Sequence, residues 1–155
     1  MLFRSEAALN LGADIVNDVR SLSDPNMADV IIENKCPVCI MHMQGLPENM
    51  QKNPSYGDVV SEVRERLEKT ARKLVDLGLN PEMIVTDPGI GFGKLLEHNL
   101  SLLAAGKEIV PTQNMQLMWG VSRKRMFADL LGRHDSEERL SGRDRKSTRL
   151  NSSHR

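Results

Sequence analysis

The chain has 155 residues, of which 21 are basic and 21 acidic, so it carries no formal net charge at neutral pH. That length allows one domain with one sizeable core, and the balanced charge provides no basic field that would attract nucleic acid or an acidic membrane. The sequence has no apolar run near the ~20 residues of a membrane span, and its first residues, MLFRSEAALN, lack the apolar core of a secretion signal. We therefore expect a cytoplasmic protein.

The apolar pattern predicts strands and helices in alternation. The expected strands cover residues 13–19, 38–41, 83–86 and 117–121. The expected helices cover residues 27–34, 58–77, 99–109 and 126–131, and a last helix is expected to begin near residue 136. Asp24 with Pro25, and Asn99, have the residue types that begin helices, and Gly78 has the type that follows a helix end.

The helix over 58–77 has the clearest periodicity. Its apolar residues recur at steps of three and four: Val60, Val63, Leu67, Ala71 and Leu74. Its basic residues are most simply the solvated face: Arg64, Arg66, Lys69, Arg72 and Lys73. Helices of crossover length between strands imply a parallel sheet, either an open doubly wound sheet or a stretch of a (β/α)8 barrel. In both architectures ligand groups gather where the strands end.

Two cysteines form the C-x-x-C pair Cys36 and Cys39. Such a pair can be redox-active or half of a zinc site, but no second pair occurs, and His42 and His98 complete no familiar ligand spacing. Because the surrounding residues form a short apolar run, we interpret the cysteines as part of a buried strand, and we predict no metal ligand in this chain. His42 is interpreted as a strand-end residue that local hydrogen bonds satisfy.

The stretch DPGIGFGK, residues 87–94, resembles a phosphate-binding loop at first sight. A Walker A loop would need a glycine where Pro88 stands and a hydroxyl residue where Leu95 stands, and the dinucleotide fingerprint would need glycine at Lys94 or Leu96. Both interpretations fail. What remains is Asp87 at a strand end, either as an acceptor for a pair of N–H donors on a flat ligand or as a turn cap, and the motif alone leaves both open.

Five ordered stretches together resemble the dihydropteroate synthase family of pterin-binding enzymes. They are GADIVNDVRSLSDP, PVCIMHMQGLPENMQ, the P-x-Y-x-D-V-V over residues 54–60, DPGIGFGK followed by HNL, and GVSRKRM. The resemblance implies an α/β fold, namely a fragment of a (β/α)8 TIM barrel with about four strand–helix units. It spans residues 1–142 as a partial pterin-binding domain.

The resemblance also implies roles for individual residues. Asn17 and Asp87 match pterin-anchoring positions, and Lys124 matches a lysine that reaches the pterin beside the p-aminobenzoate site. Met41, Gly91 and Phe92 match the pocket wall, while Ser122 and Arg123 match the loop around the second substrate and the diphosphate. Asp87, Lys124 and Arg123 would be the catalytic residues of this set.

The implied reaction joins p-aminobenzoate to 6-hydroxymethyl-7,8-dihydropterin diphosphate and releases diphosphate. It requires positioning of a flat ring and stabilisation of a departing polyanion, and the family uses Mg²⁺, whose ligand residue lies outside this segment. The implied partners are small molecules, with no nucleic acid and no membrane, and a homodimer at full length. As a fragment of the full-length enzyme, the chain alone is expected to be inactive. Half a barrel also leaves open strand edges and an uncovered core, so the chain alone is expected to be unstable or sticky.

Two alternatives remain. One is the pterin-binding domain of a methyltetrahydrofolate–corrinoid methyltransferase, and the other is a non-catalytic fragment. Residues 143–155 are set apart, since DRKSTRLNSSH at 144–154 is polar and without helical periodicity. We interpret this tail as non-native or disordered, and most simply as the translation of a sequencing adapter.

Overall fold

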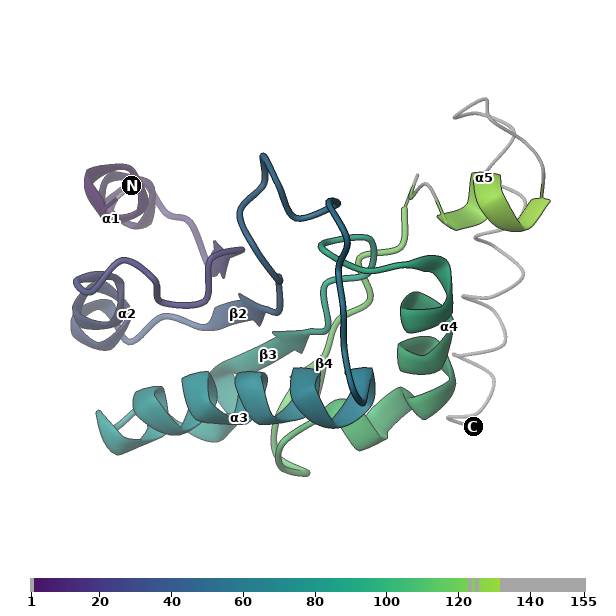
Figure 1. Ribbon diagram of the computed structural model, residues 1–155. Helices are drawn as coiled ribbons and strands as arrows, with labels where there is room; N and C mark the ends of the chain where they lie inside the picture. Colours follow the sequence, from purple (N-terminus) through teal and green to yellow (C-terminus); the bar gives the residue numbers. More distant parts are fainter. Residues whose placement is uncertain (1, 123, 125, 132–155) are drawn as a thin grey trace.

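The computed structural model describes residues 2–122, 124 and 126–131 (Figure 1). At its centre lies a parallel sheet in the order β1-β2-β3-β4. The strands are Val16–Asp18, Val38–Met41, Ile84–Asp87 and Gln116–Leu117. Each strand pairs with the next one along the chain, and a helix lies between them in sequence, which is the predicted alternation of a parallel α/β sheet.

The helices are α1 (Leu2–Asn10), α2 (Met27–Asn34), α3 (Val59–Asp76), α4 (Leu96–Ala105) and α5 (Met126–Leu131), with short 3-10 turns η1 (Pro81–Met83) and η2 (Gly106–Ile109). The long α3 runs beside the sheet and contacts β2 and α4, while α1 and α2 lie against each other near β1 (Figure 1). Within the described part of the chain, no helix is both long and apolar enough to cross a membrane.

The two faces of the sheet differ in what they carry. Val16, Val38, Ile40 and Ile84 alternate along their strands and belong to the buried core that the helices cover. The residues between them point to the other face: Asn17, Cys39, Met41, Val85 and Asp87. Polar groups for ligand contact therefore lie on the face that is turned away from the helices.

The helix α3 shows why its sequence forms a helix. Asp58 is its N-cap, and the carboxylate accepts hydrogen bonds from the N–H groups of Val60 and Ser61. Val63, Leu67, Ala71 and Leu74 are buried at steps of three and four, and the five basic residues expected on the solvated face are all exposed. Leu77 is the C-cap, and Gly78 follows it with φ +97°, which confirms the predicted helix end.

Two predicted strands are shorter in the structure. The first pairs only over Val16–Asp18, because the Asp18 carboxylate accepts the N–H groups of Arg20 (3.0 Å) and Leu22 (2.6 Å) and turns the chain. The last pairs only over Gln116–Leu117, with one further bond from Met118 N–H to the Thr86 carbonyl at 2.9 Å. Apolar residues beyond these points favoured longer strands, but they have no strand partner in the sheet.

Two predicted helix caps are wrong. The helix α4 has Leu95 as its N-cap, with the Leu95 N–H donating to His98 Nδ1 at 3.1 Å, so Asn99 lies inside the first turn. The helix α2 has Asn26 as its N-cap, since the Asp24 carboxylate closes a turn on the Asn26 N–H at 3.2 Å before the helix begins. The helix α1 was not predicted. The helix expected near residue 136 and the tail 143–155 lie outside the described residues.

Replacing Leu74 by alanine should lower the free energy of unfolding by about 2–5 kcal/mol, because this side chain is fully buried and its loss leaves a cavity in the core. Urea unfolding of the full chain, followed by circular dichroism, measures the effect. Leu77→Ala is the matched control, because Leu77 ends the same helix with 47% of its surface exposed. Equal losses for the two variants would contradict this account of the core.

Replacing Asp58 by alanine should lower the free energy of unfolding through loss of the α3 N-cap, whereas Asp58→Asn should retain most of the capping. The hydrogen bonds from Ser61 lower the pKa of the Asp58 carboxyl. A carboxyl with a depressed folded-state pKa stabilises the fold above its unfolded pKa, and this contribution is lost as pH falls through the folded value. The wild-type and alanine stabilities should therefore converge in acid, and a constant difference down to low pH would contradict the assignment.

Candidate functional site

The carboxyl ends of β2 and β3 bring the predicted residues together. The register pairs Met41 with Asp87, and the His42 N–H extends the pairing with a 2.9 Å bond to the Asp87 carbonyl. The loops that follow these strands are the β2–α3 loop (residues 42–58) and the β3–α4 loop (residues 88–95). Both rise on the same side of the sheet (Figure 1), where parallel sheets place their ligand sites.

The Asp87 carboxylate lies at the base of this region. It is buried, and its Oδ1 accepts the Gly89 N–H at 2.8 Å. A Cβ on Gly120 would lie 3.2 Å from Asp87 Oδ2, so the absence of a side chain there leaves room beside the second oxygen. Burial raises the pKa of the Asp87 carboxyl, while the Gly89 N–H and the positive charges of Lys124 and Lys94 act in the opposite direction.

The β3–α4 loop packs backbone to backbone against the β2–α3 loop. A Cβ on Gly89 would overlap the His42 carbonyl oxygen, and Gly89 also has φ +68°, so this position requires glycine. Gln51 Nε2 donates to the Gly91 carbonyl at 2.7 Å, and the Tyr56 hydroxyl donates to the Gly93 carbonyl at 2.8 Å. The glycines therefore let two loops touch, and side chains of the first loop then hold the second.

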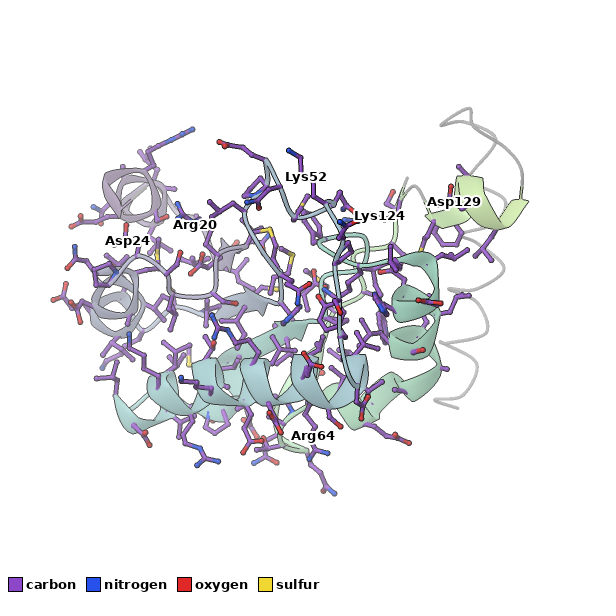
Figure 2. The ribbon with its side chains drawn as sticks, in the orientation of Figure 1. Arg20, Asp24, Lys52, Arg64, Lys124 and Asp129 are labelled. Atoms are coloured by element: carbon purple, nitrogen blue, oxygen red, sulfur yellow. The ribbon has the colours of Figure 1, made fainter. Side chains whose placement is uncertain are left out.

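Lys124 and Phe92 form the upper part of the site. The Lys124 ammonium lies 3.8 Å from the centroid of the Phe92 ring, a cation–π contact, and its Cδ lies 3.2 Å from where a Cβ on Gly91 would stand. Burial lowers the pKa of Lys124, and the Asp87 carboxylate opposes that shift. Figure 2 shows Lys124 on the side to which the loops rise, whereas Arg64 points away from α3 on the opposite side.

The remaining predicted residues fall into three groups. Met41 is buried at the end of β2, next to Asp87 in the register. Asn17 is exposed on β1, on the same face but two strands and two register positions from Asp87, so their backbones are roughly 12 Å apart. Ser122 is exposed after β4, and Arg123 lies outside the described residues.

The structure adds a buried pair that sequence reasoning did not assign to the site. His42 and Lys94 are 7% and 4% exposed, and Lys94 Nζ lies 2.9 Å from His42 Nδ1. The prediction that His42 is satisfied by local hydrogen bonds is wrong for its ring, whose partner is 52 residues away. Burial and the charges of Lys94 and Arg66 lower the pKa of His42 to about 3. Its imidazole is therefore neutral at physiological pH.

The cysteines behave as core residues. Cys36 and Cys39 are both buried and unpaired, in keeping with the buried-strand interpretation. Burial, followed by the charge of Asp87, raises the pKa of Cys39 to about 12, which keeps its thiol protonated and unreactive at neutral pH. Among the described residues, no group of three or more His, Cys, Asp or Glu side chains could hold a metal ion.

A surface hollow of about 470 Å³ lies elsewhere, between Glu65, Lys69, Arg72 and Asp76 on the exposed face of α3. Its lining is a row of solvated side chains from a single helix, without buried polar groups that converge on a ligand. The candidate site therefore lies at the strand ends, where Asp87 offers carboxylate oxygens, Phe92 an aromatic face and Lys124 a positive charge. Such an arrangement suits a flat molecule with adjacent N–H donors.

Comparisons with known proteins show which family the chain resembles. The curated dihydropteroate synthase of Escherichia coli strain K12 is 46% identical over 132 residues, which are 85% of this chain and 46% of that protein. Crystal structures of the Thermus thermophilus dihydropteroate synthase, one in complex with 6HMPPP and one with 4-aminobenzoate, are 41% identical and superpose with TM-scores of 0.82 and 0.83. They match 89% of this chain and 54% and 53% of the respective structures.

The chain spans about half the length of the curated relatives it matches. Its four parallel strand–helix units are accordingly part of a TIM barrel, as predicted, rather than an open doubly wound sheet. The model of the family described as pterin binding enzyme matches residues 4–150, which is nearly the whole chain. The chain therefore belongs to the pterin-binding enzyme family.

Proposed function

We propose that this chain is the part of a dihydropteroate synthase that holds the pterin. The reaction would join p-aminobenzoate to 6-hydroxymethyl-7,8-dihydropterin diphosphate, giving 7,8-dihydropteroate and diphosphate. The observation that carries the proposal is the buried Asp87 carboxylate beneath the Lys124–Phe92 pair. Support comes from relatives named for this activity and from neighbours whose structures contain 6HMPPP or 4-aminobenzoate.

Asp87 would anchor the pterin by charge and by geometry. A pterin ring presents an amino group beside a ring N–H, and an ionised carboxylate offers two oxygens at matching spacing. Oδ1 already accepts the Gly89 N–H, which fixes the plane of the carboxylate, and glycine at 120 leaves space beside Oδ2. Because the site is buried, each charged hydrogen bond formed there is stronger than it would be in water.

The walls would hold the ring by shape. Phe92 supplies an aromatic face, Met41 a polarisable thioether next to Asp87 in the register, and Gly91 a position where any side chain would meet Lys124. Asn17 lies on the same sheet face two strands away, a span that a bicyclic ring and two side chains can bridge. In this proposal Asn17 and Asp87 contact opposite parts of the pterin.

The chemistry would break the bond between the pterin methylene carbon and the diphosphate oxygen. The electron pair leaves with diphosphate, the ring stabilises the carbocation, and the amine of p-aminobenzoate then forms the new carbon–nitrogen bond and loses a proton. Lys124 would neutralise negative charge beside the pterin and the incoming amine. Ser122 and Arg123 would serve the second substrate and the departing diphosphate, although Arg123 lies outside the described residues.

The predicted Mg²⁺ does not fit the described part of this chain, which contains no cluster of three or more candidate ligands. We propose that its ligand residue belongs to the part of the barrel that relatives have beyond this segment. No catalytic step is assigned to the ion here. A cytoplasmic location and a homodimer at full length stay predictions.

The boundary at residue 142 also stays a proposal. The family match extends to residue 150, eight residues into the segment that we interpret as non-native or disordered. The nucleotide sequence distinguishes the two interpretations. Adapter sequence after codon 142 supports the proposed tail, whereas coding sequence that continues to resemble the family contradicts it.

A chimera tests the proposed function. Residues 7–142 would replace the matching segment of the Escherichia coli relative, so that the remainder of the barrel is supplied. We expect the chimera to form dihydropteroate from the two substrates. Asp87→Asn should lower kcat/KM for the pterin diphosphate by at least roughly tenfold, because the amide offers one acceptor oxygen and hydrogen bonds to charged groups contribute about 1.5–3 kcal/mol.

Asp76→Asn is the matched control, since Asp76 is an exposed carboxylate at the end of α3. Unchanged kinetics for Asp87→Asn would contradict the anchoring role. A folded chimera that binds pterin without forming dihydropteroate would favour a non-catalytic segment, and transfer of a methyl group from methyltetrahydrofolate would favour the corrinoid-dependent alternative.

A further inference from the structure

Lys94 is buried at the end of the β3–α4 loop with only 4% of its surface exposed. Among the described residues, no carboxylate oxygen lies within 4.0 Å of its Nζ, so the ammonium has no direct ion-pair partner there. A buried ammonium costs free energy unless polar groups replace its lost hydration. The polar groups that replace the hydration of Lys94 therefore matter for its role.

Four acceptors surround the Lys94 ammonium. Nζ lies 2.9 Å from His42 Nδ1 and donates to the carbonyl oxygens of Phe92 (3.0 Å), Gly89 (3.1 Å) and, more weakly, His42 (3.4 Å). An ammonium has three N–H donors, so the three shorter contacts use all of them. The acceptors come from the two ends of the Gly89–Phe92 turn in the β3–α4 loop and from His42, which directly follows β2.

The position of this nitrogen matters for the site. Gly89 and Phe92 are the two ends of a four-residue turn. The Gly89 N–H donates to the Asp87 carboxylate, and the Phe92 ring contacts the Lys124 ammonium. The loop is also closed by a bond from the Phe92 N–H to the Gly89 carbonyl at 3.0 Å. Holding both carbonyls from inside therefore sets the carboxylate and the aromatic face at a fixed separation.

We propose that Lys94 is a positioning residue, whose buried ammonium fastens the β3–α4 loop to the end of β2 and so holds Asp87 and Phe92 in place for a flat ligand. The link to a pterin rests on the proposed function, whereas the fastening itself does not. The same contact selects one tautomer of His42. Because Nδ1 accepts from the ammonium, the neutral ring carries its proton on Nε2.

Three charged groups face this pair: Asp87 at the end of β3, Lys124 after β4 and Arg66 on α3. Tyr56 of the β2–α3 loop also faces it, with its ring centroid 6.0 Å from that of His42. Burial lowers the pKa of Lys94 to about 7, the Asp87 carboxylate opposes this, and Lys124 reinforces it. Loss of a proton leaves two N–H donors for three short contacts. Because the pKa of Lys94 in the closed loop lies below that of an exposed lysine, opening the loop takes up a proton above neutrality, so the free energy of opening should rise with pH.

The test uses the full chain with ¹⁵N labelling and needs no catalysis. Long-range ¹H–¹⁵N spectra should show His42 as the neutral Nε2–H tautomer, without titration between pH 5 and 8. Wild-type His42 with the proton on Nδ1, or titrating near its ordinary pKa of 6.5, would overturn the proposal. This measurement decides the matter even where a variant fails to fold.

Lys94→Met keeps most of the side-chain volume and removes the ammonium. We expect the amides of Gly91 and Phe92, which are bonded to Asn99 Oδ1 and to the Gly89 carbonyl, to exchange hydrogen at least tenfold faster. The Leu67 amide in the middle of α3 should not change, and Lys107→Met, at an exposed lysine, should leave all three rates unchanged. Unchanged exchange in a folded Lys94→Met chain would refute the fastening role.

Kinetics of the chimera separate this proposal from the proposed function. Lys94→Met should raise KM for the pterin diphosphate at least tenfold, with a smaller effect on KM for p-aminobenzoate. If the parent chimera forms no product, the proposed function fails, while the tautomer and exchange data still decide the role of Lys94. Faster exchange with unaltered KM for the pterin would show that the loop is fastened without consequence for the ligand, and would overturn the positioning role.

Discussion

The parallel register of β2 and β3 is the constraint on which the site depends. It runs from Val38 with Ile84 to Met41 with Asp87, and the His42 N–H continues it to the Asp87 carbonyl. A shift of one residue would turn Asp87 toward the helices and bring Thr86 to the ligand face. The buried alternation of Val38, Ile40 and Ile84 against the helices resists such a shift, so core packing also aims the carboxylate.

Among the described residues, no buried side-chain nitrogen or oxygen atom lacks a hydrogen-bond partner, so the polar network above this register is fully satisfied. Asn99 illustrates how this is achieved, because its Oδ1 accepts the Gly91 N–H at 2.8 Å and its Nδ2 donates to the Leu95 carbonyl at 2.8 Å. Lys94 acts on the same loop from the other side. Satisfied networks of this kind are rigid, which is what a site for a flat ring requires.

Sequence patterns predicted the elements whose signal is local. The periodicity of α3, its Asp58 cap and the polar residues at the strand ends all follow from spacing, and the ordered motifs identified the family. The sequence did not reveal contacts between distant residues. Asn99 has the residue type of a helix cap, yet its side chain holds a glycine loop, and nothing near Lys94 in sequence indicates that its partner is His42, 52 residues away. Strands β1 and β4 are also shorter than their apolar runs suggested, because the length of a strand depends on its pairing with the neighbouring strand.

The direction of Lys94 gives a physical reason to expect that DPGIGFGK is not a phosphate-binding loop. A phosphate-binding lysine must present its ammonium to a ligand that lies over the loop, with free N–H groups around it. Here the ammonium points beneath the loop, and its three donors are taken by Phe92, Gly89 and His42. The glycines serve the approach of two backbones, and the Gly91 N–H is already bonded to Asn99. The loop thus directs its positive charge inward as support, and in the proposed function the carboxylate of Asp87 is the group that recognises the ligand.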